Sequence, residues 1–258
     1  MLRELKGVFL PAPLAAQRDA LRWIQAFTGP VRDLDVQLLD WDDLLTGVPA
    51  DRHAALAPVR ELLVRRRAAA LRALRRELRG AAFRHAWAGY HDFLAGDLGK
   101  ARDRPDAKRP IAEVAGRRIR TVYGRMVTDG RVIDEDSPAE QLHDLRKRGK
   151  ELRYLLELFG GLWPASVVKP MVKSLKGLQD VLGTHQDREV QADSLRSLAD
   201  DLAGMPGGPD ALLALGVLVD LLGGEQRSAR AGFAERFAAF AAPGQRKLVK
   251  ATFRDGSL

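Results

Sequence analysis

Apolar residues recur at intervals of three and four positions along most of the chain, a spacing that is typical of amphipathic helices. Glycine and proline interrupt this pattern and mark the expected ends of helices. No stretch combines sustained alternation of apolar and polar residues with β-branched side chains. The pattern therefore predicts an all-α fold, with helices near residues 2–9, 13–28, 31–46, 52–96, 111–128, 138–160, 165–182, 186–203 and 209–241.

A polar stretch over residues 128–138 is the clearest internal boundary. Ser137 is followed by Pro138 and then by Glu140, a capping-box pattern with proline at the first helical position. A helix should therefore begin at this point. We expect a single domain over residues 1–258, divided at the boundary into an N-terminal helical half, 1–130, and a C-terminal helical half, 131–258.

The two halves contain similar segments. Residues 2–9 resemble residues 152–159, and residues 29–36 resemble residues 183–190 through a shared Gly-x-x-x-Asp-x-(Asp/Glu)-Val element. In this register the basic residues correspond as Arg3 with Arg153 and Arg22 with Lys176. We expect two similar helical bundles related by a pseudo-twofold axis, and chance similarity between leucine-rich helices is the alternative.

Basic residues share one face of the helix expected over 138–160. At about 100° per residue, His143, Arg146, Lys147, Lys150 and Arg153 fall within one third of its circumference, and leucines occupy the opposite side. Exposed like charges at this spacing repel by a few tenths of a kcal/mol per pair. A helix selected for stability alone would intersperse acidic residues here, so the pattern favours binding of an anion.

Two further segments repeat this arrangement. One contains Arg65, Arg72, Arg75, Arg76 and Arg79, and the other contains Arg117, Arg118, Arg120 and Arg125. The planar guanidinium of arginine suits contact with phosphate oxygens through several donors. A solvated face that keeps a helical protein soluble is the alternative for any single helix. Three such helices in one chain favour binding.

The chain has 258 residues and a formal net charge of +8, which favours anionic partners without specifying the anion. Its 46% of hydrophobic residues suffice for a sizeable core, and the absence of cysteine excludes disulfides and thiolate chemistry. No segment approaches the roughly 20 apolar residues of a membrane span, and the N-terminus lacks the apolar run of a signal peptide. We therefore expect a cytoplasmic protein.

No motif for covalent chemistry is present. The chain lacks a Walker loop, a Gly-x-Ser-x-Gly elbow, a dinucleotide-binding fingerprint and a His-Glu-x-x-His zinc motif. We therefore expect no enzymatic activity, no catalytic residues, no cofactor and no metal site. His143 lies at the start of the basic face, where its imidazole could donate to an anion. A histidine that merely enters the helix is the alternative.

Taken together, these motifs resemble the CHAD family, the conserved histidine α-helical domain, over nearly the whole chain. The resemblance rests on His143-x-x-Arg146-x-x-x-Lys150-x-x-Arg153-Tyr154, on Leu178-Gln179-Asp180-x-Leu182-Gly183-x-x-x-Asp187-x-x-Val190, and on Gly29-x-Val31-Arg32-Asp33-Leu34-Asp35-Val36. It implies two helical bundles related by a pseudo-twofold axis, and a basic central surface or pore that binds inorganic polyphosphate. It also implies an association with polyphosphate granules.

The chain departs from the family pattern at its N-terminus. The family places a His-x-x-Arg helix in the first half as well, but Arg3 here matches Arg153, so the residue matching His143 would precede Met1. We expect either a truncated first basic helix or a true start upstream of Met1, with weaker binding than that of a complete member. The polyphosphate contacts expected from the faces, the repeat and the resemblance are Arg3, Arg22, Arg72, Arg76, Arg117, Arg120, His143, Arg146, Lys147, Lys150, Arg153 and Lys176.

Three functions remain open at this point. The first is binding of polyphosphate, driven largely by release of counterions. The second is binding of nucleic acid, which is less favoured because the four tryptophans, Trp23, Trp41, Trp87 and Trp163, are scattered outside the basic faces. The third is a scaffold for acidic protein partners or an anionic membrane surface.

Overall fold

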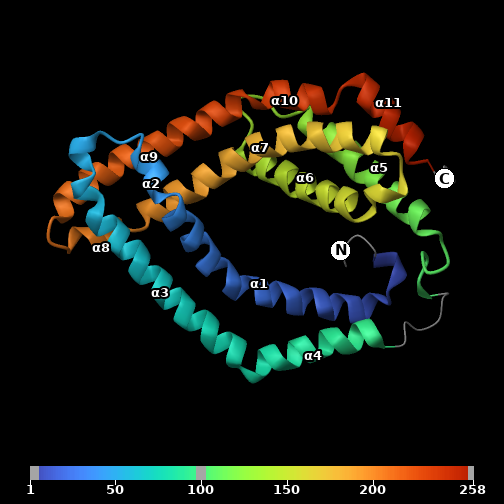
Figure 1. The fold of residues 1–258 in the computed structure, drawn as a ribbon, viewed down its shortest axis with the longest axis horizontal. Coiled ribbons are helices and arrows are strands. Elements are labelled where there is room, and N and C mark those ends of the chain that lie inside the picture. Colours follow the sequence, from blue (N-terminus) through green and yellow to red (C-terminus); the bar gives the residue numbers. More distant parts are fainter. Residues whose placement is uncertain (1–5, 97–102, 255–258) are drawn as a thin grey trace. The chain divides into compact units, whose positions relative to one another are not determined.

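The computed structural model describes residues 6–96 and 103–254 (Figure 1). Every regular element in these residues is a helix and none is a strand, so the predicted all-α class is confirmed. The chain forms two compact units. Unit 1 comprises Met1–Phe9, Lys100–Asp187 and Glu225–Leu258, and unit 2 comprises Leu10–Gly99 and Arg188–Gly224. Each unit thus combines segments that are distant along the sequence, whereas each predicted half was one continuous segment. The internal repeat stays a prediction.

Unit 1 is built around helices α5, α6 and α7. Its elements are the 3₁₀ turn η1 (Lys6–Val8), α5 (Ile111–Gly130), α6 (Ala139–Phe159), the 3₁₀ turn η5 (Gly160–Leu162), most of α7 (Ala165–Arg196), α10 (Phe233–Phe240) and α11 (Pro243–Thr252). Its core includes Ile119 and Met126 of α5, Leu145 and Leu152 of α6, and Phe253 just after α11, all fully buried. α5 and α6 therefore turn their apolar faces inward and their basic faces away from the core.

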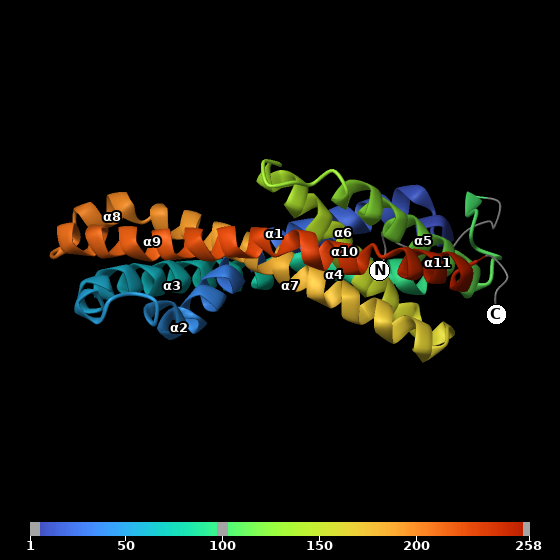
Figure 2. The same cartoon turned by 90° about the horizontal axis from the view of Figure 1, so that it is seen from above.

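Unit 2 has its own core at one end. Its elements are α1 (Pro11–Leu39), α2 (Trp41–Leu45), the 3₁₀ turns η2 (Ala50–Arg52) and η3 (Ala54–Leu56), α3 (Ala57–Arg79), α4 (Ala81–Ala95), the end of α7, α8 (Ala199–Ala203) and most of α9 (Gly208–Ala231). Trp41, Leu63, Leu198 and Leu218 belong to this core, which joins the start of α3 to α8 and α9 (Figure 2).

The other end of unit 2 is packed differently. α4 buries no residue fully, and it packs against α1 through a chain of aromatic side chains. Trp23 contacts Phe27, Phe27 contacts Phe83, and Phe83 stacks on Trp87 with ring centroids 6.2 Å apart. Trp87 remains 50% exposed. At this end, α1 and α4 therefore pack against each other through partly exposed aromatic rings, and α3 ends where α4 begins.

Several predicted helix ends are wrong. Gly29-Pro30 lies inside α1 and Gly183 lies inside α7. A proline inside a helix removes one hydrogen bond and a glycine costs about 1 kcal/mol relative to alanine. Burial of neighbours such as Val31 and Leu182 offsets these costs. Local breaker signals are therefore overridden here by tertiary packing.

Other breaks were missed. The helix predicted over 52–96 is interrupted at Gly80, whose backbone is extended, and the helix predicted over 209–241 is interrupted at Gly232. α11 was not predicted at all. Of the segment 2–9, residues 6–8 form a 3₁₀ turn rather than an α-helix, and residues 1–5, which include Arg3, lie outside the described residues.

The predicted capping box is also wrong, although α6 begins close to the expected place. The Ser137 hydroxyl donates to Oδ1 of Asp134 at 2.8 Å and accepts from the Asp134 amide at 2.9 Å, so it closes the preceding turn instead of capping α6. These contacts lower the pKa of Asp134, chiefly through the hydroxyl of Ser137. The N-cap position falls on Pro138, which has no side-chain acceptor.

No helix within the described residues has both the length and the apolar character needed to cross a bilayer.

Candidate functional site

The two faces of α6 are arranged as predicted. Leu142, Leu145, Leu152, Leu155 and Leu156 are all buried in the core of unit 1. On the opposite side Lys147 is exposed, and the other four predicted contacts, His143, Arg146, Lys150 and Arg153, are half-buried. For His143 and Arg146 the cause is α7, which packs beside the start of this face.

Two polar contacts join the start of the α6 basic face to α7. Nδ1 of His143 hydrogen-bonds to Oε1 of Gln186, and Nη2 of Arg146 donates to Oδ1 of Asp187 at 3.0 Å. The Arg146 side chain is 18% exposed, whereas that of Asp187 is 62% exposed. Asp187 therefore pairs with an arginine, and it lies within α7 and not at a helix start. His143 and Arg146 help to hold α6 on α7 as well as presenting charge.

Lys147 and Arg153 of this face pair with acids on their own helix. Nζ of Lys147 lies 2.6 Å from Oδ1 of Asp144, and this hydrogen bond and the nearby charge lower the pKa of Asp144. Nε of Arg153 lies 3.4 Å from Oε1 of Glu157, and its guanidinium lies over the ring of Tyr154 at 5.1 Å. These pairs are well exposed, so solvent screening keeps them weak and an anion could displace them.

α7 adds lysines to unit 1. Lys169, Lys173 and Lys176 are exposed and spaced so that they share one side of the helix. None of the three has an acidic partner among the residues that the structure describes. Lys176 is a predicted contact, and its two neighbours extend the same side of α7.

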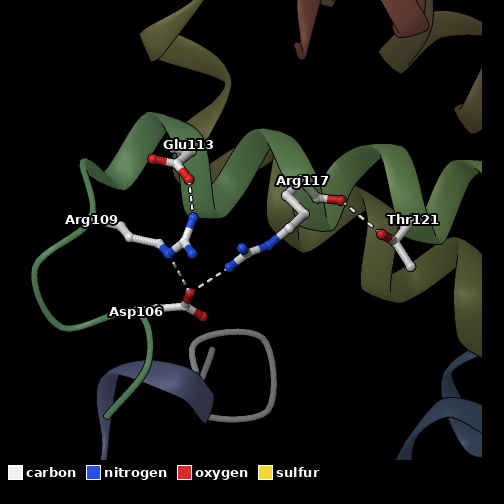
Figure 3. A network of polar contacts seen from close by, with 5 residues as sticks. All are labelled: Asp106, Arg109, Glu113, Arg117 and Thr121. Atoms are coloured by element: carbon white, nitrogen blue, oxygen red, sulfur yellow. Dashed lines mark hydrogen bonds and ion pairs between the residues drawn. The ribbon is translucent and has the colours of Figure 1, made fainter. Parts of the chain in front are cut away.

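The arginines of α5 differ from the prediction of a free cationic face, because the fold gives them internal partners. Figure 3 shows Arg117 bound to Asp106, which also lies 3.5 Å from Nε of Arg109. Arg109 in turn pairs with Glu113, and Thr121 donates to the carbonyl of Arg117 at 2.8 Å. This network fixes the loop before α5 onto the helix.

The loop carrying Asp106 is itself pinned by η1. The amide of Asp106 donates to the carbonyl of Gly7 at 2.9 Å, and a Cβ at position 7 would lie 2.2 Å from the Asp106 carboxylate. Glycine is therefore required at this close approach. Arg117 thus belongs to a structural junction in unit 1.

Two more α5 arginines have interior partners. Arg118 pairs with Glu151 of α6, whose side chain is 8% exposed, and Arg120 donates to the backbone carbonyl of Phe253. A carboxylate this deeply buried needs a paired cation, because an unpaired buried charge is costly. Sequence spacing could not reveal these partners, since Glu151 and Phe253 are distant along the chain.

The arginines of α3 show the opposite behaviour. Arg72, Arg75, Arg76 and Arg79 are exposed and, with Gly80, line a hollow of about 460 Å³ at the end of the helix. No acidic residue in the described part of the chain pairs with any of the four. Towards the start of α3, Arg65 instead pairs with Glu61. In α1, the predicted contact Arg22 pairs with Asp19 in an exposed position.

Sequence reasoning missed two groups of residues that bear on function. The first is the aromatic row on α1 and α4. The tryptophans were expected to be scattered, whereas Trp23 and Trp87 both belong to this row. Their i, i+4 spacing with Phe27 and Phe83 was the available signal. The second is the basic set on α11, which was overlooked because that helix was not predicted. No group of three or more possible metal ligands occurs within residues 6–96 and 103–254.

These features define a class of all-helical protein in which dense basic residues lie on helix faces opposite a leucine-rich core. The model of the family described as CHAD domain matches residues 1–196, and the chain therefore belongs to the CHAD family. The match includes α1 to α7, whereas α8 to α11 lie beyond it. A search of curated proteins found no match.

Proposed function

We propose that this protein binds inorganic polyphosphate through its basic helix faces and catalyses no reaction. Membership of the CHAD family supports the choice of anion, through the resemblance described above. The observation that carries the proposal is the hollow lined by Arg72, Arg75, Arg76 and Arg79 on α3. In the cell, we propose a cytoplasmic protein that associates with polyphosphate granules.

Physical chemistry explains why such a hollow suits a phosphate chain. Four guanidinium groups within about two turns of helix repel one another, and acids at i+3 or i+4 would ordinarily relieve this repulsion. Here the described residues supply no such acid. A polyanion with a charge on every phosphoryl unit would supply the missing negative charge, and guanidinium groups can contact phosphate oxygens bidentately.

The second contribution comes from unit 1. The exposed lysines of α7, Lys169, Lys173 and Lys176, together with Lys147 of α6, present flexible ammonium groups suited to a mobile chain. Under the predicted pseudo-twofold repeat, Arg22 in α1 would take the place that Lys176 has in α7. The repeat is therefore part of the proposal, with equivalent basic residues in the two predicted halves, 1–130 and 131–258.

The experiment compares two double variants in unit 2. Arg72→Gln with Arg76→Gln removes two cations of the hollow, and Arg52→Gln with Arg60→Gln removes two exposed cations outside the basic face of α3. Glutamine preserves helix propensity. Each lost contact to a charged group should weaken polyphosphate binding by about 1.5–3 kcal/mol, so the first variant should lose at least about a hundredfold in affinity. The control should lose much less.

Salt dependence gives a second readout. If phosphate contacts release counterions as single-stranded nucleic acid does, log affinity should fall with log salt by about 0.7 per contact. The hollow variant should therefore show a shallower slope than wild type by about 1.4, whereas the control should keep the wild-type slope. Equal affinities and slopes for the two variants would remove α3 from the site and the main support for this function.

A second candidate function has a specific observation in its favour. Trp87 is half-exposed within the aromatic row of α4, and bases of single-stranded nucleic acid stack on such rings. Arg84, one turn before Trp87, is exposed on the same helix and donates to the carbonyl of Arg79 at 2.6 Å. Competition at matched charge and salt among long polyphosphate, RNA and an acidic peptide separates the candidates. Preference for RNA, abolished by Trp87→Ala, would favour nucleic acid, and preference for the peptide would favour a scaffold.

A further inference from the structure

A cleft of about 550 Å³ lies between α5 and α11, entirely within unit 1. This volume is within the usual range of roughly 300–1,000 Å³ for sites that hold small molecules. The residues of α11 that line it, among them Arg246, Lys247 and Lys250, were not predicted as contacts for polyphosphate. α11 also lies beyond the residues that the family model matches.

The charge of the cleft has one sign. Five cations line it, Arg120, Arg131, Arg246, Lys247 and Lys250, and no carboxylate does. Arg120 is tied to the carbonyl of Phe253, but the other four have no acidic partner among the residues described. Cations that converge on a concave surface without acids repel one another, and a bound anion would relieve the repulsion.

The beginning of α11 adds to this preference. Pro243, the first residue of the helix, lines the cleft, and the N-cap residue Ala242 offers no side-chain acceptor. The first amides of a helix lack partners within the helix, and they carry a partial positive charge. An anion beside Pro243 would therefore meet the amides of the first turn in addition to the side-chain cations.

The cleft is not purely polar. Val127 of α5, Val249 of α11 and the ring of Tyr123 form part of its wall beside the cations. The Tyr123 hydroxyl donates to the carbonyl of Phe240 at 2.9 Å. Tyr123, Val127 and Val249 are almost fully buried, so the exposed apolar groups of the lining are chiefly Pro243 and the alkyl stems of the cations. An inorganic phosphate chain would gain nothing from these exposed groups, whereas an organic molecule would bury apolar surface against them.

We propose that the cleft between α5 and α11 binds a small organic polyanion whose phosphates are attached to a ring, the chemistry of a nucleoside triphosphate. The phosphates lie among the cations and the α11 amides, and the ring lies against the alkyl stems of the cations on α11. The proposal does not depend on polyphosphate binding at α3 and α6. It uses four cations that no other part of the proposed function requires.

The test is calorimetric titration of adenosine triphosphate into the full chain without divalent metal. Lys247→Glu with Lys250→Glu reverses two cations of the cleft, and Lys6→Glu with Lys108→Glu makes the same charge change at exposed positions of unit 1 outside it. The cleft variant should bind adenosine triphosphate at least about a hundredfold more weakly than wild type, because two charge-assisted contacts are lost and two repulsive carboxylates are added. The control should stay within about threefold of wild type, since distant surface charges are screened by salt.

Inorganic tripolyphosphate, which has the charged chain but no ring, should bind wild type more weakly than adenosine triphosphate. Equal binding of the two probes would overturn the proposal, as would equal losses in the two variants or no binding by wild type at millimolar concentration. Arg131→Gln, a single change at an exposed residue, tests the same site if the double variant does not fold. Arg72→Gln with Arg76→Gln should keep wild-type affinity for adenosine triphosphate, so failure of the α3 proposal and of this one are distinguishable.

Discussion

Helices α3 and α5 have similar arginine-rich sequences but differ in what surrounds their arginines. On α5, Arg117, Arg118 and Arg120 pair with Asp106, with Glu151 and with the carbonyl of Phe253. On α3, Arg72 and Arg76 are exposed, line a hollow and have no acidic partner among the described residues. The first group holds elements of unit 1 together, and the second leaves its charge available. A count of cations on a helix face cannot separate these two roles.

The difference follows from where each helix lies. α5 is the central element of unit 1, flanked by α6, α11 and the loop before it, so its polar side chains reach acids and carbonyls on three neighbours. α3 contacts α1 and α4, and it pairs with an acid of α1 further from its end, where Arg67 meets Asp35. At its last turns, Arg72, Arg75, Arg76 and Arg79 have no acidic partner among the described residues. We therefore expect substitutions of arginine to change the free energy of unfolding by different amounts on the two helices.

The largest effect should come from Arg118→Met on α5. This change removes the Arg118 guanidinium that pairs with the buried Glu151, and removing one partner of a buried pair typically costs about 3–5 kcal/mol. Arg72→Met on α3 removes an exposed side chain and should change stability by less than about 0.5 kcal/mol. Urea denaturation of the two variants measures both values.

A double variant provides the control for this prediction. Arg118→Met with Glu151→Met replaces both charges by apolar groups of similar length and should recover much of the lost stability. If Arg118→Met were no more destabilising than Arg72→Met, the two helices would not differ in the way proposed.

The next effect concerns Tyr123, the other polar anchor of α5. Its hydroxyl donates to the buried carbonyl of Phe240, and Tyr123→Phe should cost about 1–2 kcal/mol at pH 7 because that carbonyl loses its donor. Burial raises the pKa of Tyr123 to about 12, against an ordinary value near 10. The neutral form is therefore favoured by folding, and this contribution is complete below pH 10 and lost as the pH rises towards 12.

The pH dependence separates tyrosine from other groups that titrate in this range. The stability difference between wild type and Tyr123→Phe should be constant from pH 7 to about 9 and should shrink above pH 10, as measured by denaturation at each pH. Lysines titrate in both proteins, so their effect cancels in the difference. A difference that stays constant up to pH 11.5 would contradict the assignment.

The contrast between α3 and α5 also shows how far the sequence leads. The leucine period of α6 predicted its buried side, and the basic period predicted its other side, because both depend on positions within one helix. Partners of Arg118 and Arg146 depend on where Glu151 and Asp187 arrive in space, which no local period encodes. The same limit explains why the helix ends predicted at Gly29-Pro30 and Gly183 are wrong. Burial of neighbouring residues there outweighs the cost of placing glycine or proline inside a helix. α11 was missed because Pro243-Gly244 was interpreted as a breaker, although proline is favoured in the first turn of a helix.

The smallest effect should be found on α6. Its pairing is intermediate between that of α3 and that of α5, because Lys147 and Arg153 have acidic partners but these partners are exposed. Asp144→Asn removes the partner of Lys147 and should hardly change stability, since both side chains are 57% exposed and the pair is screened. Affinity for polyphosphate should rise by about twofold to fivefold, because Lys147 becomes free and a negative charge disappears.

Acid titration sharpens the prediction for α6. Lys147 lowers the pKa of Asp144, so the pair's contribution is present above the ordinary carboxyl value of about 3.9 and is lost as the pH falls through the lower folded pKa. The gain in affinity given by Asp144→Asn should therefore persist from pH 7 through pH 4, and it should disappear only as the pH falls further, through the lowered pKa at which wild-type Asp144 becomes protonated. Titrations of polyphosphate into both proteins across this range measure the gain. A variant that binds more weakly than wild type at pH 7 would mean that Asp144 positions Lys147 for the anion, and α6 would then resemble α5 more than α3.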